Sequence, residues 1–173
     1  MLGEKLQSYN IYKKPIINRH FRKNNQAIQS ELYFSSRDRI KADKTKIAMA
    51  MGMFAQINII DIKTGTIKGL RIANTPDFTY LTKDPKAFRE FYIDINIDDY
   101  HIFCLYLDKL IYGNERSSYS ANELHVFNWK GDFFYKIILD KHSSEIAFDP
   151  VKKQLYSLTP EDLLYSYDLS FLY

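Results

Sequence analysis

The 173-residue sequence contains a single cysteine, Cys104. One thiol excludes an intrachain disulfide bond and any metal cluster built from several thiolates. Cys104 lies in the apolar run 102–107, so we expect it to be buried and chemically inert. Cysteine usage therefore leaves the cellular compartment open.

Long hydrophobic runs are also missing. The first ten residues, MLGEKLQSYN, lack the apolar core of a signal peptide. No stretch approaches the roughly 20 apolar residues of a membrane-spanning helix. We therefore expect neither an export signal nor a membrane span in this chain.

The net charge is small, at +3, and does not by itself indicate a nucleic-acid partner. The charge is uneven, because residues 1–46 hold 11 Lys/Arg against 4 Asp/Glu (+7), whereas the rest holds 13 against 17 (−4). The basic side chains near the start are Lys13, Lys14, Arg19, Arg22 and Lys23. We interpret this segment as a solvated terminus and expect no nucleic-acid binding.

Glycine and proline are scarce, with 6 and 5 residues, whereas aromatic residues are abundant, with 14 Tyr and 12 Phe. The chain is long enough to bury one sizeable core. Aromatic and β-branched residues favour strands, so the composition predicts a globular β domain.

The most regular stretch is 122–140, NELHVFNWKGDFFYKIILD. Two apolar runs, Leu124–Trp129 and Phe133–Leu139, flank the dipeptide Lys130-Gly131. Gly131 can adopt a positive φ without steric cost, as a tight hairpin turn requires. The pattern predicts two antiparallel strands joined by a two-residue turn.

Similar segments recur at intervals of 53 residues. Ile40, Ile93 and Ile146 each begin a segment of the same order, which is a short strand, a polar turn, an apolar strand, a connection and a further strand. Ile40 is predicted to be buried. The spacing indicates a repeat of short strands.

The later strand of each repeat ends in a polar residue: Asp61, Asn128 or Asp168. Recurrence at this place predicts a side-chain cap on the following turn. Similarly, Asp98-Asp99 is interpreted as a turn rather than as a metal or catalytic site. Trp129, the only tryptophan, is expected to pack between repeats.

A repeat of about 40–50 residues with four short strands is typical of a β-propeller blade. The imperfect polar/apolar alternation agrees with strands packed on both faces. We predict an all-β chain that forms a β-propeller segment of about three four-stranded antiparallel blades; a β-sandwich or barrel is the alternative. The expected divisions are a poorly defined basic segment or partial blade at 1–30, then blades at about 31–82, 83–140 and 141–173.

Three blades do not close a ring, because closed propellers have about four to eight. An open arc would expose apolar blade faces and strand edges. The sequence therefore predicts either a part of a longer propeller or association of two copies through the exposed faces.

Four matches resemble one family. They are Val126-Phe127-Asn128-Trp129 with Gly131, Lys136–Asp140, Ile146–Asp149 and Lys153–Tyr156. They are similar to the motifs I-x-V-F-D-W-x-G, K-I-x-L-D and I-A-V-D-x-x-x-K-x-I-Y. These motifs occur in the C-terminal blades of TolB-like six-bladed propeller lipoproteins of gut Bacteroidetes. The similarity covers residues 32–173.

This resemblance implies a protein of the cell envelope, in the periplasm or at the outer membrane, with no known biochemical activity. It also implies a longer full-length form with a lipidated N-terminal cysteine. We expect the present chain to depart from the family in two ways, by having no such cysteine with its signal peptide and no first half of the ring.

Catalytic and metal-binding motifs are absent from the sequence. The four histidines, His20, His101, His125 and His142, have no close pair at ligand spacing, and a packed role is expected for His125. No serine-nucleophile, zinc, P-loop or dinucleotide motif occurs. We therefore assign no catalytic, cofactor or metal residue and expect no cofactor.

One loop has the composition of a contact surface. Residues 112–122, YGNERSSYSAN, are polar and contain the four candidate binding residues Tyr112, Asn114, Arg116 and Tyr119. We predict a non-enzymatic binding or scaffold module for an unidentified protein or small molecule. The alternatives are a propeller-type hydrolase or lactonase, with carboxylates or histidines converging at one end, and a truncated gene product without an independent role.

Overall fold

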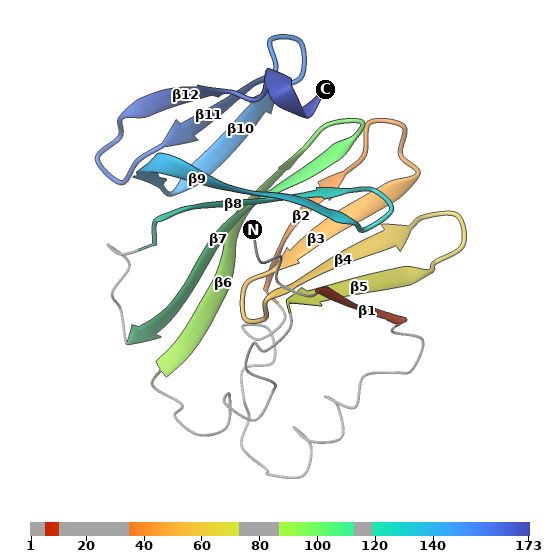
Figure 1. Cartoon of the computed structure of the whole chain (residues 1–173). Coiled ribbons are helices and arrows are strands. Elements are labelled where there is room, and N and C mark those ends of the chain that lie inside the picture. Colours follow the sequence, from red (N-terminus) through yellow and green to blue (C-terminus); the bar gives the residue numbers. More distant parts are fainter. Residues whose placement is uncertain (1–5, 11–34, 73–86, 113–118) are drawn as a thin grey trace.

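The computed structural model describes residues 6–10, 35–72, 87–112 and 119–173 (Figure 1). Within these ranges the chain forms β-strands and one short 3₁₀ helix, and no α-helix. No helix among the described residues has the length and apolarity needed to cross a bilayer.

The strands form three antiparallel sheets. The first sheet has the order β1-β5-β4-β3-β2, with β1 Leu6–Asn10, β2 Ser36–Ile40, β3 Lys46–Met51, β4 Gln56–Asp61 and β5 Ile67–Ile72. The second has the order β6-β7-β8-β9, with β6 Ala87–Ile97, β7 His101–Tyr112, β8 Ala121–Asn128 and β9 Phe133–Ser143. The third has the order β10-β11-β12, with β10 Glu145–Asp149, β11 Gln154–Leu158 and β12 Leu164–Asp168, followed by the 3₁₀ helix Ser170–Leu172.

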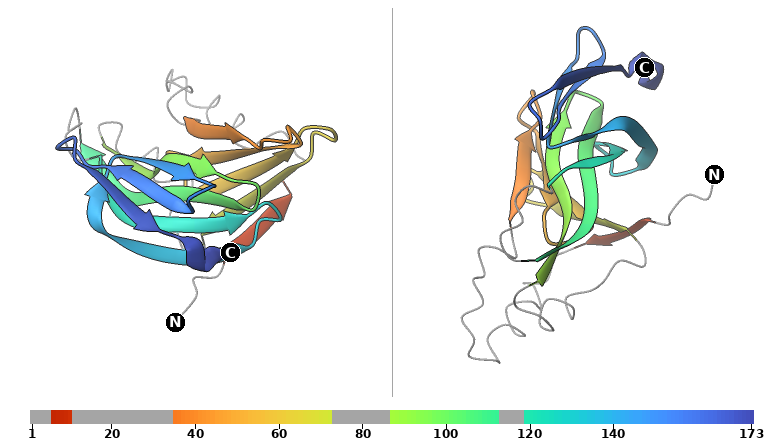
Figure 2. Two further views of the ribbon diagram at one scale, coloured as in Figure 1. Left: turned by 90° about the horizontal axis from the view of Figure 1, so that it is seen from above. Right: turned by 90° about the vertical axis from the view of Figure 1, so that its left-hand side faces the viewer.

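The sheets follow one another through the molecule as successive blades, from the orange and yellow strands through the green and teal ones to the blue ones (Figures 1 and 2). This confirms the predicted all-β propeller segment of about three blades. The second sheet has the expected four strands, whereas the first gains β1 as a fifth and the described part of the third has three. The rest of the segment 1–30 lies outside the described residues.

The hairpin of β8 and β9 is present, but its turn is longer than predicted. The Gly131 N–H donates to the Asn128 carbonyl at 2.9 Å, and the Asn128 N–H donates to the Asp132 carbonyl at 3.0 Å. The loop is therefore Trp129-Lys130-Gly131, a turn closed by Gly131 at φ 87°. The prediction of a two-residue turn was wrong, because a three-residue loop with a glycine in the left-handed conformation also matches the twist of the strands.

The predicted side-chain caps are confirmed. In each sheet, the polar residue that ends the strand accepts a hydrogen bond from a backbone N–H of the following segment: Thr64 to Asp61 Oδ1 at 2.8 Å, Lys130 to Asn128 Oδ1 at 2.9 Å, and Ser170 to Asp168 Oδ1 at 2.8 Å. The turn at Asp98 is confirmed too, since its carboxylate accepts the backbone N–H of Tyr100 at 2.7 Å.

The core has two parts, one on each side of the second sheet. Ile102 and Cys104 of β7 pack in the cluster shared with the first sheet, whereas Phe103 and Leu105 pack in the cluster shared with the third. All four are fully buried. Successive strand residues point to opposite faces, so an apolar run without alternation is what a sheet covered on both sides requires.

Two smaller predictions about the core are confirmed. Cys104 is a buried free thiol, and burial raises its pKa well above the ordinary value, which keeps it protonated. Trp129 is buried in the cluster between the first and second sheets. A third prediction was wrong: Ile40 is 58% exposed, because it ends the edge strand β2 beside a turn, whereas Ile93 and Ile146 are buried.

Candidate functional site

The first strands of the three repeats, β2, β6 and β10, meet in space. β6 contacts both β2 and β10, although the three strands belong to different sheets. We call the surface that they form the axial face, since it faces the axis around which the blades succeed one another. Residues from three distant parts of the sequence therefore share one surface.

A pocket with a volume of about 490 Å³ lies on the axial face. Its lining is mostly polar and combines both charges: Arg37 and Arg39 of β2, Ile93 and Asp94 of β6, Tyr119, and Ser144, Glu145 and Ile146 at the start of β10. A concave site with a few convergent polar groups is the usual form of a ligand site.

Asp94 has its two carboxylate oxygens engaged by the backbone. Oδ1 accepts the N–H of Ile95 at 2.8 Å, and Oδ2 accepts the N–H of Ile146 at 2.7 Å. The second bond joins β6 to β10 across two sheets. Arg39 Nη2 lies 3.8 Å from Asp94 Oδ1. Asp94 therefore holds the pocket together and positions one arginine at its wall.

Glu90 of β6 is a buried carboxyl group, with 7% of its surface exposed. Burial raises its pKa, and the charge of Arg37 and a hydrogen bond from Tyr119 oppose that rise. Glu90 thereby ties the loop residue Tyr119 and the edge-strand residue Arg37 to the inner strand of the second sheet.

The two arginines give the pocket its chemistry. A guanidinium group presents a planar set of N–H donors that match carboxylate and phosphate oxygens. Both arginines are exposed on β2, and Arg39 has 43% of its side chain accessible. The arrangement can accept an anionic group of a ligand, while Tyr119, Ser144 and Glu145 offer neutral and acidic hydrogen-bonding partners.

The predicted contact loop is only partly described. Tyr119 is half-buried and lines the axial pocket. Tyr112 ends strand β7, and its side chain, like Asn114 and Arg116 as a whole, lies outside the described residues. Binding by these four residues stays a prediction.

Sequence reasoning missed Arg37, Arg39 and Glu145. The charge pattern of residues 1–46 predicts a solvated segment, and Arg37 and Arg39 belong to that segment. The available signal was that all three lie in the first strand of a repeat, and first strands of successive blades converge.

His125 is packed in the core, as predicted. It is 1% exposed, stacks on Tyr106 with ring centroids 4.3 Å apart, and contacts the Tyr92 hydroxyl through Nδ1 at 3.1 Å. Its Nε2 lies 2.7 Å from Glu123 Oε1. In the described part of the chain, no group of three or more His, Cys, Asp or Glu side chains has the arrangement of a metal site.

Neither protein-family models nor curated proteins match the sequence. The structure, in contrast, resembles solved structures. A "putative conserved lipoprotein" from Clostridium novyi NT superposes with a TM-score of 0.53 and 11% identity, over 95% of this chain and 94% of that chain. At this identity the likeness is one of fold.

Two lyase structures are less similar. Virginiamycin B lyase from Staphylococcus aureus has a TM-score of 0.44 and 15% identity, over 96% of this chain and 46% of the lyase. A streptogramin B lyase structure has a TM-score of 0.43 and 13% identity, over 96% and 45%. The chain thus spans less than half of either lyase, and the conclusion supported by these comparisons is the shared fold of this chain and the lipoprotein.

Proposed function

We propose that this chain is a non-enzymatic ligand-binding module of a β-propeller, and that the axial pocket holds an anionic group of its ligand. The observation that carries the proposal is the convergence of Arg37 and Arg39 with Tyr119 and Glu145 in one pocket. These residues come from separate repeats, and each presents a polar group to the same space.

The state of the carboxylates favours binding over catalysis. Both oxygens of Asp94 accept backbone N–H groups, so this residue is committed to structure. No histidine of the described residues lines the pocket, which leaves Glu145 as its exposed carboxylate. The hydrolase or lactonase alternative therefore depends on Glu145 as a general base.

Calorimetric titration with inorganic phosphate and with succinate tests the binding proposal. We expect binding that weakens with salt and that is lost in Arg37→Gln and Arg39→Gln, since each removes a guanidinium from the pocket. Lys63→Gln is the control, because it removes one exposed positive charge outside the lining. Equal affinities in all four proteins would overturn the proposal.

A panel of esters and lactones tests the enzymatic alternative. We expect the purified chain to turn over none of them. Hydrolysis that disappears in Glu145→Gln and persists in Glu161→Gln, an exposed carboxylate outside the pocket, would replace the binding proposal with the catalytic one.

We further propose that the chain belongs to a TolB-like, six-bladed lipoprotein of the cell envelope. The motif resemblance over residues 32–173 supports this, as does the lipoprotein described for the structure from Clostridium novyi. Fractionation of the source cells, followed by fatty-acid labelling, should place the full-length protein with the envelope and show a lipid. Recovery in the cytosol without label would contradict the assignment.

Association of two copies through their exposed blade faces is the accompanying proposal. Light scattering on the purified chain should then give a mass near 41 kDa, twice the 20.5 kDa of one chain. A stable 20.5 kDa species at high concentration would show that the blade faces do not pair.

A further inference from the structure

A second cleft, separate from the axial pocket, lies where turns of all three sheets meet. Its volume is about 720 Å³. It is bounded by Lys41 after β2, the β6–β7 turn, the β8–β9 turn, Lys153 before β11 and the C-terminal Tyr173. It shares no lining residue with the axial pocket. We call it the aromatic cleft.

Exposed aromatic rings form its walls. Tyr100, Phe134 and Tyr173 are 65%, 48% and 48% exposed. The ring of Tyr173 stands nearly perpendicular to two neighbours, at 6.1 Å and 80° from Tyr100 and at 5.0 Å and 85° from His101. These two contacts therefore present both faces and edges of aromatic rings to the cleft.

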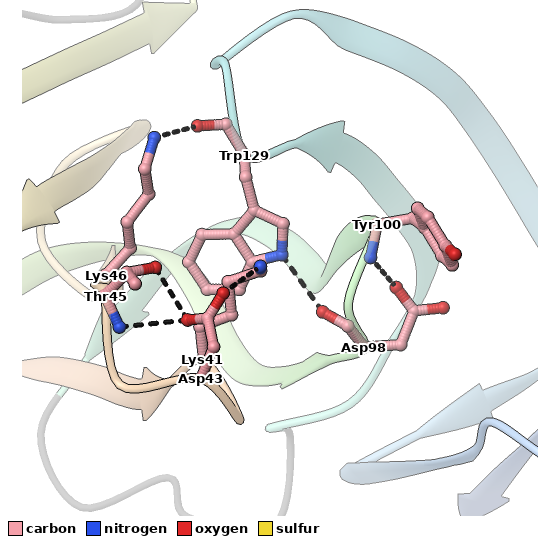
Figure 3. A network of polar contacts seen from close by, with 7 residues as sticks. All are labelled: Lys41, Asp43, Thr45, Lys46, Asp98, Tyr100 and Trp129. Atoms are coloured by element: carbon pink, nitrogen blue, oxygen red, sulfur yellow. Dashed lines mark hydrogen bonds and ion pairs between the residues drawn. The ribbon is translucent and has the colours of Figure 1, made fainter.

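Hydrogen bonds within the second sheet, and one between the first and second sheets, hold the floor of the cleft (Figure 3). The indole Nε1 of Trp129 donates to the carbonyl of Asp98 at 3.0 Å, and Lys46 Nζ donates to the carbonyl of Trp129 at 3.1 Å. The Asp98 carboxylate in turn accepts the N–H of Tyr100 at 2.7 Å. These contacts fix the turn that carries the exposed ring of Tyr100.

Lysines surround the aromatic walls. Lys41, Lys130 and Lys153 line the cleft, against the single acidic side chain of Asp99. Lys153 Nζ lies 3.7 Å from the ring centroid of Tyr173, in a cation–π contact.

Lys41 is held at the rim by Asp43, at 2.5 Å. Hydrogen bonds from Lys41 and Thr45 lower the pKa of Asp43 to about 2, so this carboxylate stays ionised and keeps Lys41 in place. The ionised Asp43 balances the charge of Lys41, so the positive charge of the cleft comes from Lys130 and Lys153, opposed by Asp99. The remaining excess of positive charge favours anions over cations.

We propose that the aromatic cleft binds an acidic saccharide, a sugar chain that bears carboxylate or sulfate groups. Sugar rings present apolar C–H faces, which pack on the electron-rich faces of aromatic rings. Their acidic groups would reach the ammonium groups of Lys130 and Lys153. Those lysines disfavour a cationic ligand, and a neutral sugar would form no ion pair with them.

Trp129 supplies the readout, because it is the only tryptophan of the chain and it lines this cleft. Titration with tri-galacturonate should change its fluorescence, and the affinity should fall severalfold when salt is raised from low to physiological concentration. Maltotriose, a neutral trisaccharide, should bind much more weakly. Equal response to maltotriose, tighter binding of adenosine monophosphate, or no response to any probe would overturn the proposal.

Matched variants locate the site. Tyr100→Ala and Lys130→Gln change exposed side chains and should each weaken tri-galacturonate binding by about tenfold. The controls are Tyr135→Ala, an exposed ring outside the lining, and Lys63→Gln. Arg39→Gln, which affects the axial pocket, should leave this binding unchanged. Losses in the controls as large as in the cleft variants would contradict the assignment, with circular dichroism verifying that every variant is folded.

Discussion

The second and third sheets follow the same repeat pattern but have different surroundings. The second lies between two neighbours, and its apolar side chains on both faces, such as Phe103 and Cys104, are fully buried. The third has the second sheet on one side. Leu155 of its middle strand is buried there, whereas Leu164 is 69% exposed.

The comparison shows that burial in a repeat architecture is a property of position along the stack as well as of sequence. A repeat supplies apolar side chains for two faces, and each face becomes core when a neighbouring repeat covers it. Changes in the covered sheet should therefore cost more than equivalent changes in the end sheet.

The largest expected difference concerns core truncation. Phe103→Ala should lower the free energy of unfolding by about 3–5 kcal/mol, because it leaves a cavity in the fully covered sheet. Leu164→Ala in the end sheet should change it by less than about 0.5 kcal/mol. Urea denaturation measures both. Similar losses in the two variants would mean that the third sheet is covered on its other face, for example by a second copy.

The next effect concerns the bond between the two sheets. Asp94→Ala should destabilise the fold by about 1–3 kcal/mol, because the buried N–H of Ile146 loses its acceptor. Asp94→Asn, which keeps one acceptor oxygen, should cost less. Hydrogen exchange should show faster exchange of the Ile146 amide in Asp94→Ala. Unchanged exchange would show that the sheets are held without this bond.

A smaller effect compares a covered turn with an open one. Gly131 and Gly65 both have positive φ, at 87° and 69°. A Cβ at Gly131 would lie 3.0 Å from Leu70 of the first sheet, whereas nothing lies within 4 Å at Gly65. Gly65→Ala should cost about 1 kcal/mol through backbone strain alone, and Gly131→Ala should cost more. Thermal unfolding distinguishes them, and equal costs would refute contact between the turn and the first sheet.

The smallest effect concerns a charge on the second sheet. Burial would raise the pKa of Glu123, but hydrogen bonds from His125 and Lys136 outweigh it and hold the pKa below the ordinary value of a glutamate. A depressed pKa gives stability that is present above the unfolded value and lost as the pH falls through the folded one. Glu123→Gln should therefore be less stable than the parent at pH 7 and equally stable near pH 2, in urea denaturation at both pH values. A gap that persists in acid would assign the loss to packing.

Local chemistry explains what could be predicted of the fold. Strand segments followed from runs of aromatic and β-branched residues, and turns followed from side chains that cap their own backbone, such as Asp61 and Asn128. The buried Cys104 and the packed His125 followed from their places within apolar strands. The prediction that Ile40 is buried was wrong, because its exposure depends on the edge position of β2. The neighbouring residues in the sequence do not indicate that position.

The candidate sites were much less predictable. Tyr119 was expected to contact a ligand from an exposed loop, and it instead lies half-buried beside Glu90 and the arginines of β2. The aromatic cleft assembles Lys41, Tyr100, Phe134 and Tyr173 from four separate segments. No spacing rule links such residues, because their proximity arises from how the blades pack.

The sequence by itself determined the all-β composition, the 53-residue spacing, the hairpins and the capped turns, since each depends on contacts within a few residues or between neighbouring strands. The tertiary structure alone decided which strands face the axis, which faces are covered and which side chains share a pocket. Those features depend on contacts between sheets, whose geometry is set by packing of the two core clusters rather than by any local preference.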